Sequence, residues 1–204
     1  SYPMQSDKPG VWWMGYSAVG EIMEVGPEET ELKLGDKVWC QTGHKTFMAS
    51  DSFLKLPDDV DVENATFLAL LNITFNGMLD AGVKLLDDVV ILGMGTLGQM
   101  LLQMCQHSGA KVIAVDYLDS RLELASKFGA DVTFNPQKQG DLGQFVQQHT
   151  NGRGADVVIE VSGNVKALSD AIRCASVDGT VTVLSFYQGG ADSLMLGQEF
   201  HHKR

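Results

Sequence analysis

The sequence predicts an α/β fold in which a small β-rich domain precedes a doubly wound parallel sheet. Two features support this prediction. From residue 58 onward, short segments rich in Val and Ile alternate with helical segments, as in a parallel sheet covered on both faces. Residues 1–57 instead contain short apolar segments separated by turn residues, without helical periodicity. We therefore expect two domains, at residues 1–57 and 58–204.

The first domain is expected to form a small β-barrel or sandwich. Ala18–Gly26 has the pattern of a bent strand with glycines near its ends, and Gly35–Cys40 that of a turn followed by a strand. Two more strands are expected at Phe47–Ala49 and Phe53–Leu56. Short strands joined by glycine turns are typical of small all-β domains.

The second domain is expected to begin with a helix over Val62–Ala81, capped by Asp61 or Asn64. Strands and helices then alternate, and right-handed crossovers predict a doubly wound sheet. We expect the strand order 3-2-1-4-5-6 of dinucleotide-binding sheets, with the sixth strand absent from this chain. The strands are expected at 89–92, 112–115, 132–134, 157–161 and 180–184, and the helices at 96–108, 119–128, 141–149 and 164–175.

The composition excludes some classes of partner. The 204-residue chain has 15 Lys and Arg against 26 Asp and Glu, a formal net charge of −11. This charge repels phosphate backbones and anionic membrane surfaces, so neither nucleic acid nor a membrane is an expected partner. No apolar run reaches the roughly 18 residues of a membrane-spanning helix. Cys40, Cys105 and Cys174 form no paired pattern, which favours the cytoplasm, and the last two are expected to be buried, inert thiols.

A glycine motif follows the first strand of the second domain. It opens the next helix, as in a Rossmann dinucleotide site. Gly93 permits a tight turn, Gly95 lets a pyrophosphate approach the backbone, and Gly98 lets the helix pack closely. The helix N-terminus would attract the phosphates. The expected cofactor-binding residues of this loop are Gly93, Met94, Gly95, Thr96, Leu97 and Gly98.

Asp116 ends the second strand of this domain. A carboxylate there can accept hydrogen bonds from the adenosine ribose, and it would repel the 2′-phosphate of NADP, so NAD is the expected cofactor. Arg121, one turn into the next helix, either faces the cofactor or is a solvated residue that pairs with Asp119 or Glu123. Asp116 could also act only as a helix cap.

Two later strands end at the same edge of the sheet. Ser162 and Gly163 follow the fourth strand, and Ser185 follows the fifth. Ligands of such sheets bind outside the carboxyl ends of the strands, so these small residues are expected to leave room for the cofactor. Ordinary turn chemistry is an equally good interpretation of each residue taken alone.

The chain resembles the medium-chain dehydrogenase/reductase superfamily, near its zinc-type alcohol dehydrogenase-like members and the bacteriochlorophyllide dehydrogenase-like branch. The segments that carry the resemblance keep the family's order: Gly15–Gly20, Gly35–Val38, Leu92–Gly98, Gly152–Glu160 and Glu199–His202. The resemblance implies a GroES-like barrel before the Rossmann domain, a reaction between the two, and a homodimer. It also implies truncation at both ends, so we expect the 204 residues to bind cofactor poorly and to turn over little.

The sequence departs from the zinc-dependent pattern. Tyr16 and Ser17 stand where the resemblance would place a zinc ligand and a neighbouring acid, and a further ligand position falls near Ala69. The four-cysteine zinc lobe is absent, and neither Cys40 with His44 nor His201 with His202 supplies enough ligands. We therefore expect no metal. Tyr16 is the candidate proton donor, although it could instead pack the barrel, and His44 is a weaker candidate.

These features predict an oxidoreductase that transfers a hydride between NAD(H) and an alcohol/carbonyl substrate without zinc. One alternative is a quinone- or enoyl-reductase-like enzyme, which commonly uses NADPH and which Asp116 disfavours. The other is a dinucleotide-binding fragment without turnover.

Overall fold

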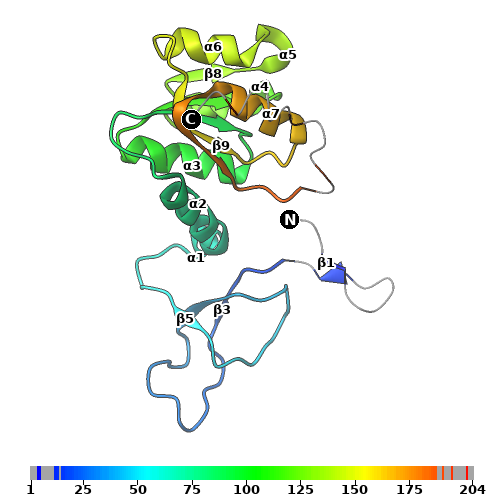
Figure 1. Ribbon diagram of the computed structural model, residues 1–204. Coiled ribbons are helices and arrows are strands. Elements are labelled where there is room, and N and C mark those ends of the chain that lie inside the picture. The colour runs from blue at the N-terminus through cyan, green and yellow to red at the C-terminus, as the bar shows by residue number, and fades with distance from the viewer. Residues whose placement is uncertain are drawn as a thin grey trace. The chain divides into compact units, whose positions relative to one another are not determined.

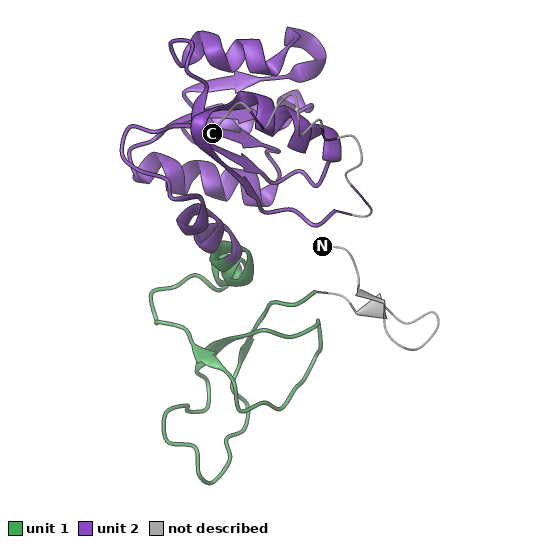
Figure 2. Ribbon diagram, in the orientation of Figure 1, with its two compact units in different colours: residues 1–72 green, residues 73–204 purple. Residues whose placement is uncertain are grey.

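A computed structural model describes residues 4–5, 12–13, 15–187, 190, 194 and 201. The chain divides into two compact units, residues 1–72 and 73–204 (Figure 2). The division falls inside one helix, whereas the sequence pattern changes near Pro57. The expected domain boundary at residue 57 remains a prediction. No helix among the described residues combines the length and apolarity that a membrane span requires.

Unit 1 contains two small antiparallel sheets. Strands β1 (Met4–Gln5) and β2 (Trp12–Trp13) pair with each other. Strands β3 (Ala18–Glu21), β4 (Lys37–Cys40) and β5 (Leu54–Lys55) form a three-stranded sheet in the order β3-β4-β5. Its small core consists of Ile22, Val38, Cys40 and Leu56.

One expected strand of unit 1 is wrong. Phe47–Ala49 has no strand structure, and the Phe47 side chain is 81% exposed. An isolated apolar residue in a loop can have the pattern of a strand without any partner to pair with. The strand expected over Ala18–Gly26 also ends early, at Glu21, because Ile22 and Gly35 begin the connection to β4 with a backbone hydrogen bond of 2.9 Å.

The helix expected over Val62–Ala81 is interrupted. Asp61 caps α1 (Val62–Ala65) by accepting a hydrogen bond from the Asn64 amide at 2.9 Å, and α2 (Leu68–Ala81) follows. At the break, the backbone N–H and the side-chain hydroxyl of Thr66 both donate to the Glu63 carbonyl, at 3.2 and 2.6 Å. This tight turn replaces the ordinary helical hydrogen bond to the fourth preceding residue.

Unit 2 contains a five-stranded parallel sheet, of which Figure 1 labels β8 and β9. The strand order is β10-β9-β6-β7-β8. The expected relative order of the five strands is confirmed, because these strands are the fifth, fourth, first, second and third of the unit. Their bounds are β6 Asp88–Leu92, β7 Lys111–Val115, β8 Val132–Phe134, β9 Ala155–Glu160 and β10 Ala175–Val183.

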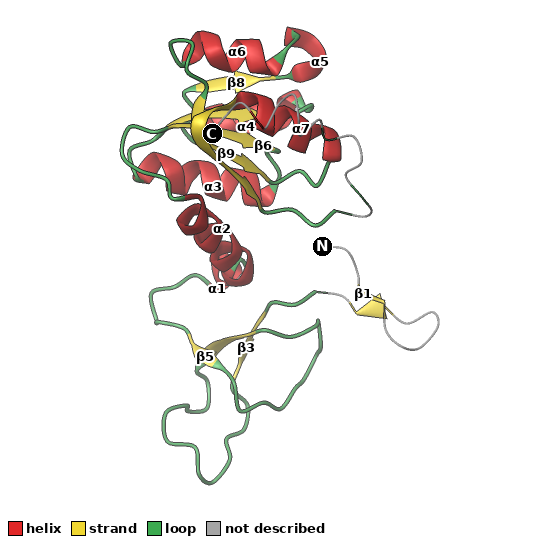
Figure 3. Cartoon of the chain, viewed as in Figure 1, coloured by secondary structure: helices red, strands yellow, loops and turns green. Residues whose placement is uncertain are grey.

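Helices cover both faces of this sheet, as Figure 3 shows. Along β6, Val89 and Ile91 join one buried cluster while Val90 and Leu92 join the other, which is the pattern of a strand buried on both sides. The helices are α3 Thr96–His107, α4 Asp119–Lys127, α5 Pro136–Gln139, α6 Leu142–His149 and α7 Val165–Cys174. The doubly wound fold is therefore confirmed.

Two details of unit 2 differ from the prediction or extend it. Strand β10 begins at Ala175, directly after α7, and its register with β9 shifts between Ala175 and Thr180. The expected strand at 180–184 is therefore the second half of a longer one. Cys105 and Cys174 are buried as expected, and burial raises the pKa of the Cys105 thiol to about 12. Such a thiol is inert near neutral pH.

Candidate functional site

The loop between β6 and α3 depends on three glycines for three different reasons. Gly93 has a φ of +106°, a conformation that L residues with a side chain rarely adopt. Around Gly95 there is open space, because a Cβ added there would meet no atom within 4 Å. A Cβ on Gly98 would lie 1.9 Å from the carbonyl oxygen of Gly93, so the first turn of α3 can pass this close to the loop only with glycine at that position.

The remaining loop residues have different environments. The Met94 side chain is buried in the core and is 1% exposed. Thr96, Leu97 and Gly98 form the first turn of α3, where Gly95 offers no side chain to cap the helix. The backbone N–H groups of a first turn have no partner within the helix. Together with the open space at Gly95, they form a concave, electropositive cradle suited to a phosphate.

Asp116 connects the glycine loop to the end of β7. One of its oxygens accepts a hydrogen bond from the Met94 amide at 2.8 Å, and the other accepts one from the Leu118 amide at 2.9 Å. The side chain is 7% exposed. A carboxylate has about four acceptor positions, so these bonds leave capacity for a ligand's hydroxyl groups.

Arg121 pairs with Asp116. Its Nη1 lies 3.4 Å from Oδ2 of Asp116, while its side chain remains 49% exposed. Among the described residues, the ion pair of Arg121 is with Asp116, and the Asp119 carboxylate bonds Lys138 and the Asn135 amide. Arg121 is therefore held beside the cavity by the residue expected to bind the ribose.

A cavity of about 400 Å³ lies at the carboxyl ends of the strands in unit 2. Five of the expected site residues line it: Gly93, Gly95, Asp116, Arg121 and Ser162. Met94, Thr96, Leu97, Gly98, Gly163 and Ser185 are not among its lining residues. Sequence reasoning missed the other lining residues, namely Leu92, Val115, Tyr117, Pro136, Leu142, Val161, Asn164, Ala167 and Asp170.

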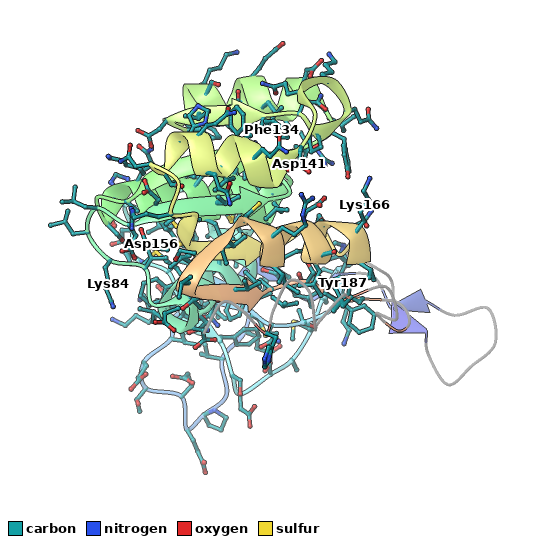
Figure 4. The ribbon with its side chains drawn as sticks, turned by 45° about the horizontal axis from the view of Figure 1, so that its top comes forward. Lys84, Phe134, Asp141, Asp156, Lys166 and Tyr187 are labelled. Carbon is teal, nitrogen blue, oxygen red and sulfur yellow. The ribbon has the colours of Figure 1, made fainter. Side chains whose placement is uncertain are left out.

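The loops after β9 and β10 are organised around Glu160. This carboxylate is fully buried at the end of β9, and one of its oxygens accepts hydrogen bonds from the Ser162 amide and hydroxyl and the Gly163 amide. The hydroxyl of Tyr187 donates to the other oxygen (Figure 4 labels Tyr187). Burial and the Glu160 carboxylate together raise the pKa of Tyr187.

The serine hydroxyls of these loops are engaged within the protein. Ser162 Oγ donates to Glu160 and accepts from the Asn164 amide, while Ser185 Oγ accepts from the Gly163 amide at 2.8 Å. Their observed contacts are those of loop architecture, and only Ser162 also lines the cavity. A carboxylate directly after the apolar run Val157–Ile159 was the signal in the sequence for Glu160, since a buried acid requires several donors.

In unit 1, Tyr16 and Ser17 stand where the resemblance would place a zinc ligand and a neighbouring acid. Ser17 Oγ donates to the Thr66 carbonyl at 2.8 Å and accepts from Trp39 Nε1 at 2.7 Å, so this hydroxyl is already engaged. Tyr16 is half-buried. The His44 ring packs against Gly15, because a Cβ added to that glycine would clash with the ring. In the described part of the chain, no three His, Cys, Asp or Glu residues gather where they could hold a metal ion. These residues do not fit a zinc ion.

Comparison with known proteins identifies the family. Residues 96–204, more than half of the chain, match the family model described as "Zinc-binding dehydrogenase". This chain belongs to the zinc-binding dehydrogenase family. It is thereby a member of the medium-chain dehydrogenase/reductase superfamily that the sequence motifs resemble.

Two curated relatives illustrate the similarity. The chain is 33% identical to D-guloside 3-dehydrogenase of Escherichia coli (strain K12), over 98% of this chain and 60% of the relative. It is 32% identical to an alcohol dehydrogenase of Geobacillus stearothermophilus, over 72% of this chain and 54% of the relative. The chain thus spans less than two thirds of these relatives.

Solved structures support the fold. The 2R,3R-butanediol dehydrogenase of Bacillus subtilis superposes with a TM-score of 0.77 at 24% identity, covering 87% of this chain and 59% of that one. The mycobacterial protein Rv1454c, solved in complex with NADPH, superposes with a TM-score of 0.73 at 22% identity, covering 96% of this chain and 63% of that one.

Proposed function

We propose that the chain binds NAD(H) and contributes to hydride transfer between this cofactor and an alcohol/carbonyl substrate. The observation that carries the proposal is Asp116, which lines the cavity with an almost buried carboxylate and holds the glycine loop through the Met94 amide. A carboxylate at this place favours the free ribose hydroxyls of NAD over the 2′-phosphate of NADP.

The binding mode follows from the same geometry. The pyrophosphate would lie against Gly95 and the first turn of α3, where a glycine Cα leaves open space. The ribose would lie at Asp116, and the nicotinamide end would extend toward the loops that contain Ser162, Gly163 and Ser185. The bound nicotinamide supplies the hydride chemistry, and the protein supplies orientation and electrostatics.

The proposal extends to the substrate and the proton donor. The printed names of the relatives describe dehydrogenases of alcohols and sugar derivatives, which supports a substrate with a hydroxyl group. Because the residues of unit 1 do not fit zinc, another group would have to stabilise the developing alkoxide, and Tyr16 remains our candidate. The homodimer and the cytoplasmic location also remain predictions.

A second candidate is an NADPH-dependent quinone- or enoyl-reductase-like enzyme. Arg121 lines the cavity beside Asp116, and a guanidinium is the preferred partner of a 2′-phosphate. A structural neighbour was solved with NADPH. We favour NAD because Asp116 faces the same place as Arg121 and would lie next to that phosphate. The third candidate is a chain that binds the dinucleotide without turnover.

The substitution Asp116→Ser tests the choice of cofactor. The wild type is expected to bind NADH at least about tenfold more tightly than NADPH, because a carboxylate beside a phosphate costs more than 1 kcal/mol at partly buried range. In Asp116→Ser this preference should narrow or reverse, since the repulsion is removed and Arg121 becomes available to the phosphate. Fluorescence titration of both reduced cofactors measures the two dissociation constants.

The double substitution Asp116→Ser/Arg121→Ala is the matched control. It should lose the gain in NADPH affinity while keeping the weakened NADH binding. Tighter binding of NADPH than of NADH by the wild type would contradict the proposed cofactor. Because weak binding is expected of these 204 residues, the titration extends to roughly millimolar cofactor. Binding of neither cofactor in that range would contradict the dinucleotide site itself.

A further inference from the structure

The cavity is also lined by residues outside the glycine loop. Tyr117 and Pro136 line it from the segments after β7 and β8. Leu142, at the start of α6, and Ala167, on α7, complete an apolar slot. Figure 4 labels Asp141, the N-cap residue just before Leu142, and Lys166, the α7 residue just before Ala167. The slot has the character of a site for a flat, largely apolar ring.

One ionisable side chain interrupts the apolar lining of the slot. Asp170 lies three residues after Ala167 on α7, so the two share a helix face, and both line the cavity. The Asp170 side chain is only 19% exposed, and burial raises its pKa. An acid this well buried requires a hydrogen-bond partner when it is charged.

The cation next to Asp170 is held mainly by another acid. Arg173 directs Nη2 to Asp141 at 2.6 Å, whereas its Nη1 lies 3.5 Å from Asp170, at the limit of a useful contact. Lys166, on the same helix, contributes only a long-range charge effect to Asp170. A carboxylate is an acceptor with about four positions, so Asp170 retains capacity to accept a hydrogen bond from a ligand in the slot.

We propose that Asp170 accepts a hydrogen bond from the exocyclic amine of the adenine ring and thereby makes the site selective for adenine dinucleotides. The inference rests on the proposed function. If the pyrophosphate lies at Gly95 and the ribose at Asp116, the base extends into this slot. Adenine carries an amine donor at this ring position. Hypoxanthine carries a keto oxygen there, and two acceptors, the keto oxygen and the carboxylate, would repel each other.

The test compares NADH with reduced nicotinamide hypoxanthine dinucleotide, which differs from NADH at that group and the adjacent ring nitrogen. For the full chain, we expect the hypoxanthine analogue to bind roughly 10- to 100-fold more weakly, the range for losing a hydrogen bond to a charged group. Fluorescence titration gives both dissociation constants. This comparison needs no variant, so it does not depend on the folding of a mutant.

Asp170→Asn then assigns the selectivity to this residue. An amide can either accept from adenine or donate to hypoxanthine, so the ratio of the two dissociation constants should fall toward one. The matched control is Glu123→Gln, which removes one charge from an exposed position of α4 outside the cavity lining and should leave the ratio unchanged.

The outcomes separate this inference from the proposed function. Tight NADH binding with equally tight binding of the hypoxanthine analogue would overturn the role of Asp170 and leave the dinucleotide site standing. Selectivity that persists in Asp170→Asn would also overturn it. Failure to bind either dinucleotide would overturn the proposed function and the inference with it.

Discussion

At the scale of single residues, two glycines of the loop have different roles, one in packing and one in leaving space for a ligand. Gly98 is required by packing, because any Cβ there would lie 1.9 Å from the Gly93 carbonyl oxygen. No protein atom lies within 4 Å of a Cβ added at Gly95, so the missing side chain leaves room for a ligand and not for packing. The same small substitution should therefore lower the stability of the protein at Gly98 and the affinity for cofactor at Gly95.

Gly98→Ala should destabilise the protein, whereas Gly95→Ala should mainly weaken cofactor binding. The first change forces α3 away from the loop and should cost about 1–3 kcal/mol of unfolding free energy, the usual range for overpacking. The second keeps the packing, with a loss of about 1 kcal/mol or less at the helix cap, but places a methyl group where the pyrophosphate would lie. Urea unfolding and NADH titration of both variants measure the two effects.

The two variants also serve as each other's control. If Gly95→Ala retained wild-type affinity for NADH, the phosphate would not lie at Gly95. If Gly98→Ala were as stable as the wild type, the close approach of α3 to Gly93 would be wrong.

At the scale of elements, the hydrogen-bonded pair Glu160 and Tyr187 connects the segment after β10 to the end of β9. The two residues are 27 positions apart in the sequence, and the bond between them lies beside the loop that contains Ser162. A fully buried carboxylate depends on its donors, and Tyr187 is the donor that comes from a different segment of the chain.

Tyr187→Phe should lower the free energy of unfolding by about 1–3 kcal/mol, because it leaves a buried carboxylate with one donor fewer. The measurement is urea unfolding followed by circular dichroism. Tyr117→Phe is the matched control, since it removes the same hydroxyl from a side chain that is 36% exposed. Equal stability of Tyr187→Phe and the wild type would show that Glu160 does not need this donor.

At the scale of the whole molecule, the family description and the residues present differ over zinc. The family model is named for zinc binding, yet Tyr16, Ser17 and Ala69 stand at the positions that the resemblance would give to a zinc ligand or its neighbour. Zinc requires three or four converging nitrogen, sulfur or oxygen ligands. Its absence from this chain therefore remains a prediction with a clear physical basis.

Purified protein should contain far less than one zinc ion per chain after treatment with a mild chelator. Elemental analysis measures the metal content, and a zinc-dependent alcohol dehydrogenase treated in parallel is the control for the chelation step. Stoichiometric zinc that survives the chelator would show that ligands outside the arrangement described here hold a metal.

The sheet of unit 2 ends on one side with β10, which pairs only with β9 in the described part of the chain. Val183 and Phe186 near this edge are 46% and 79% exposed. An uncovered strand edge pairs readily with another strand. The expected sixth strand would pair with this edge, so the edge is not evidence for the expected homodimer, which remains a prediction.

The sequence by itself determined the class and order of unit 2. Strands buried on both faces have continuous apolar runs, and crossover connections have one preferred hand, so the alternating segments predict five parallel strands in a doubly wound sheet. Their order followed from the dinucleotide-binding motif, because that motif is typical of sheets with the order 3-2-1-4-5-6. The glycine motif and Asp116 were also predictable, because a turn after a strand and a carboxylate at the end of the next strand are local patterns. In unit 1 the short strand expected at Phe47–Ala49 failed, because pairing requires a partner that local sequence does not specify.

Only the tertiary structure decided which side chains surround the cavity. Asp170 and Leu142 lie on different helices, and Glu160 meets Tyr187 across two loops, so neither set is visible as a motif. Arg121 pairs with Asp116, while Asp119 binds Asn135 and Lys138. Periodicity records which face of an element is buried, but contacts between residues far apart depend on how the helices pack. The packing of the helices therefore decides which charged and apolar side chains line the cavity.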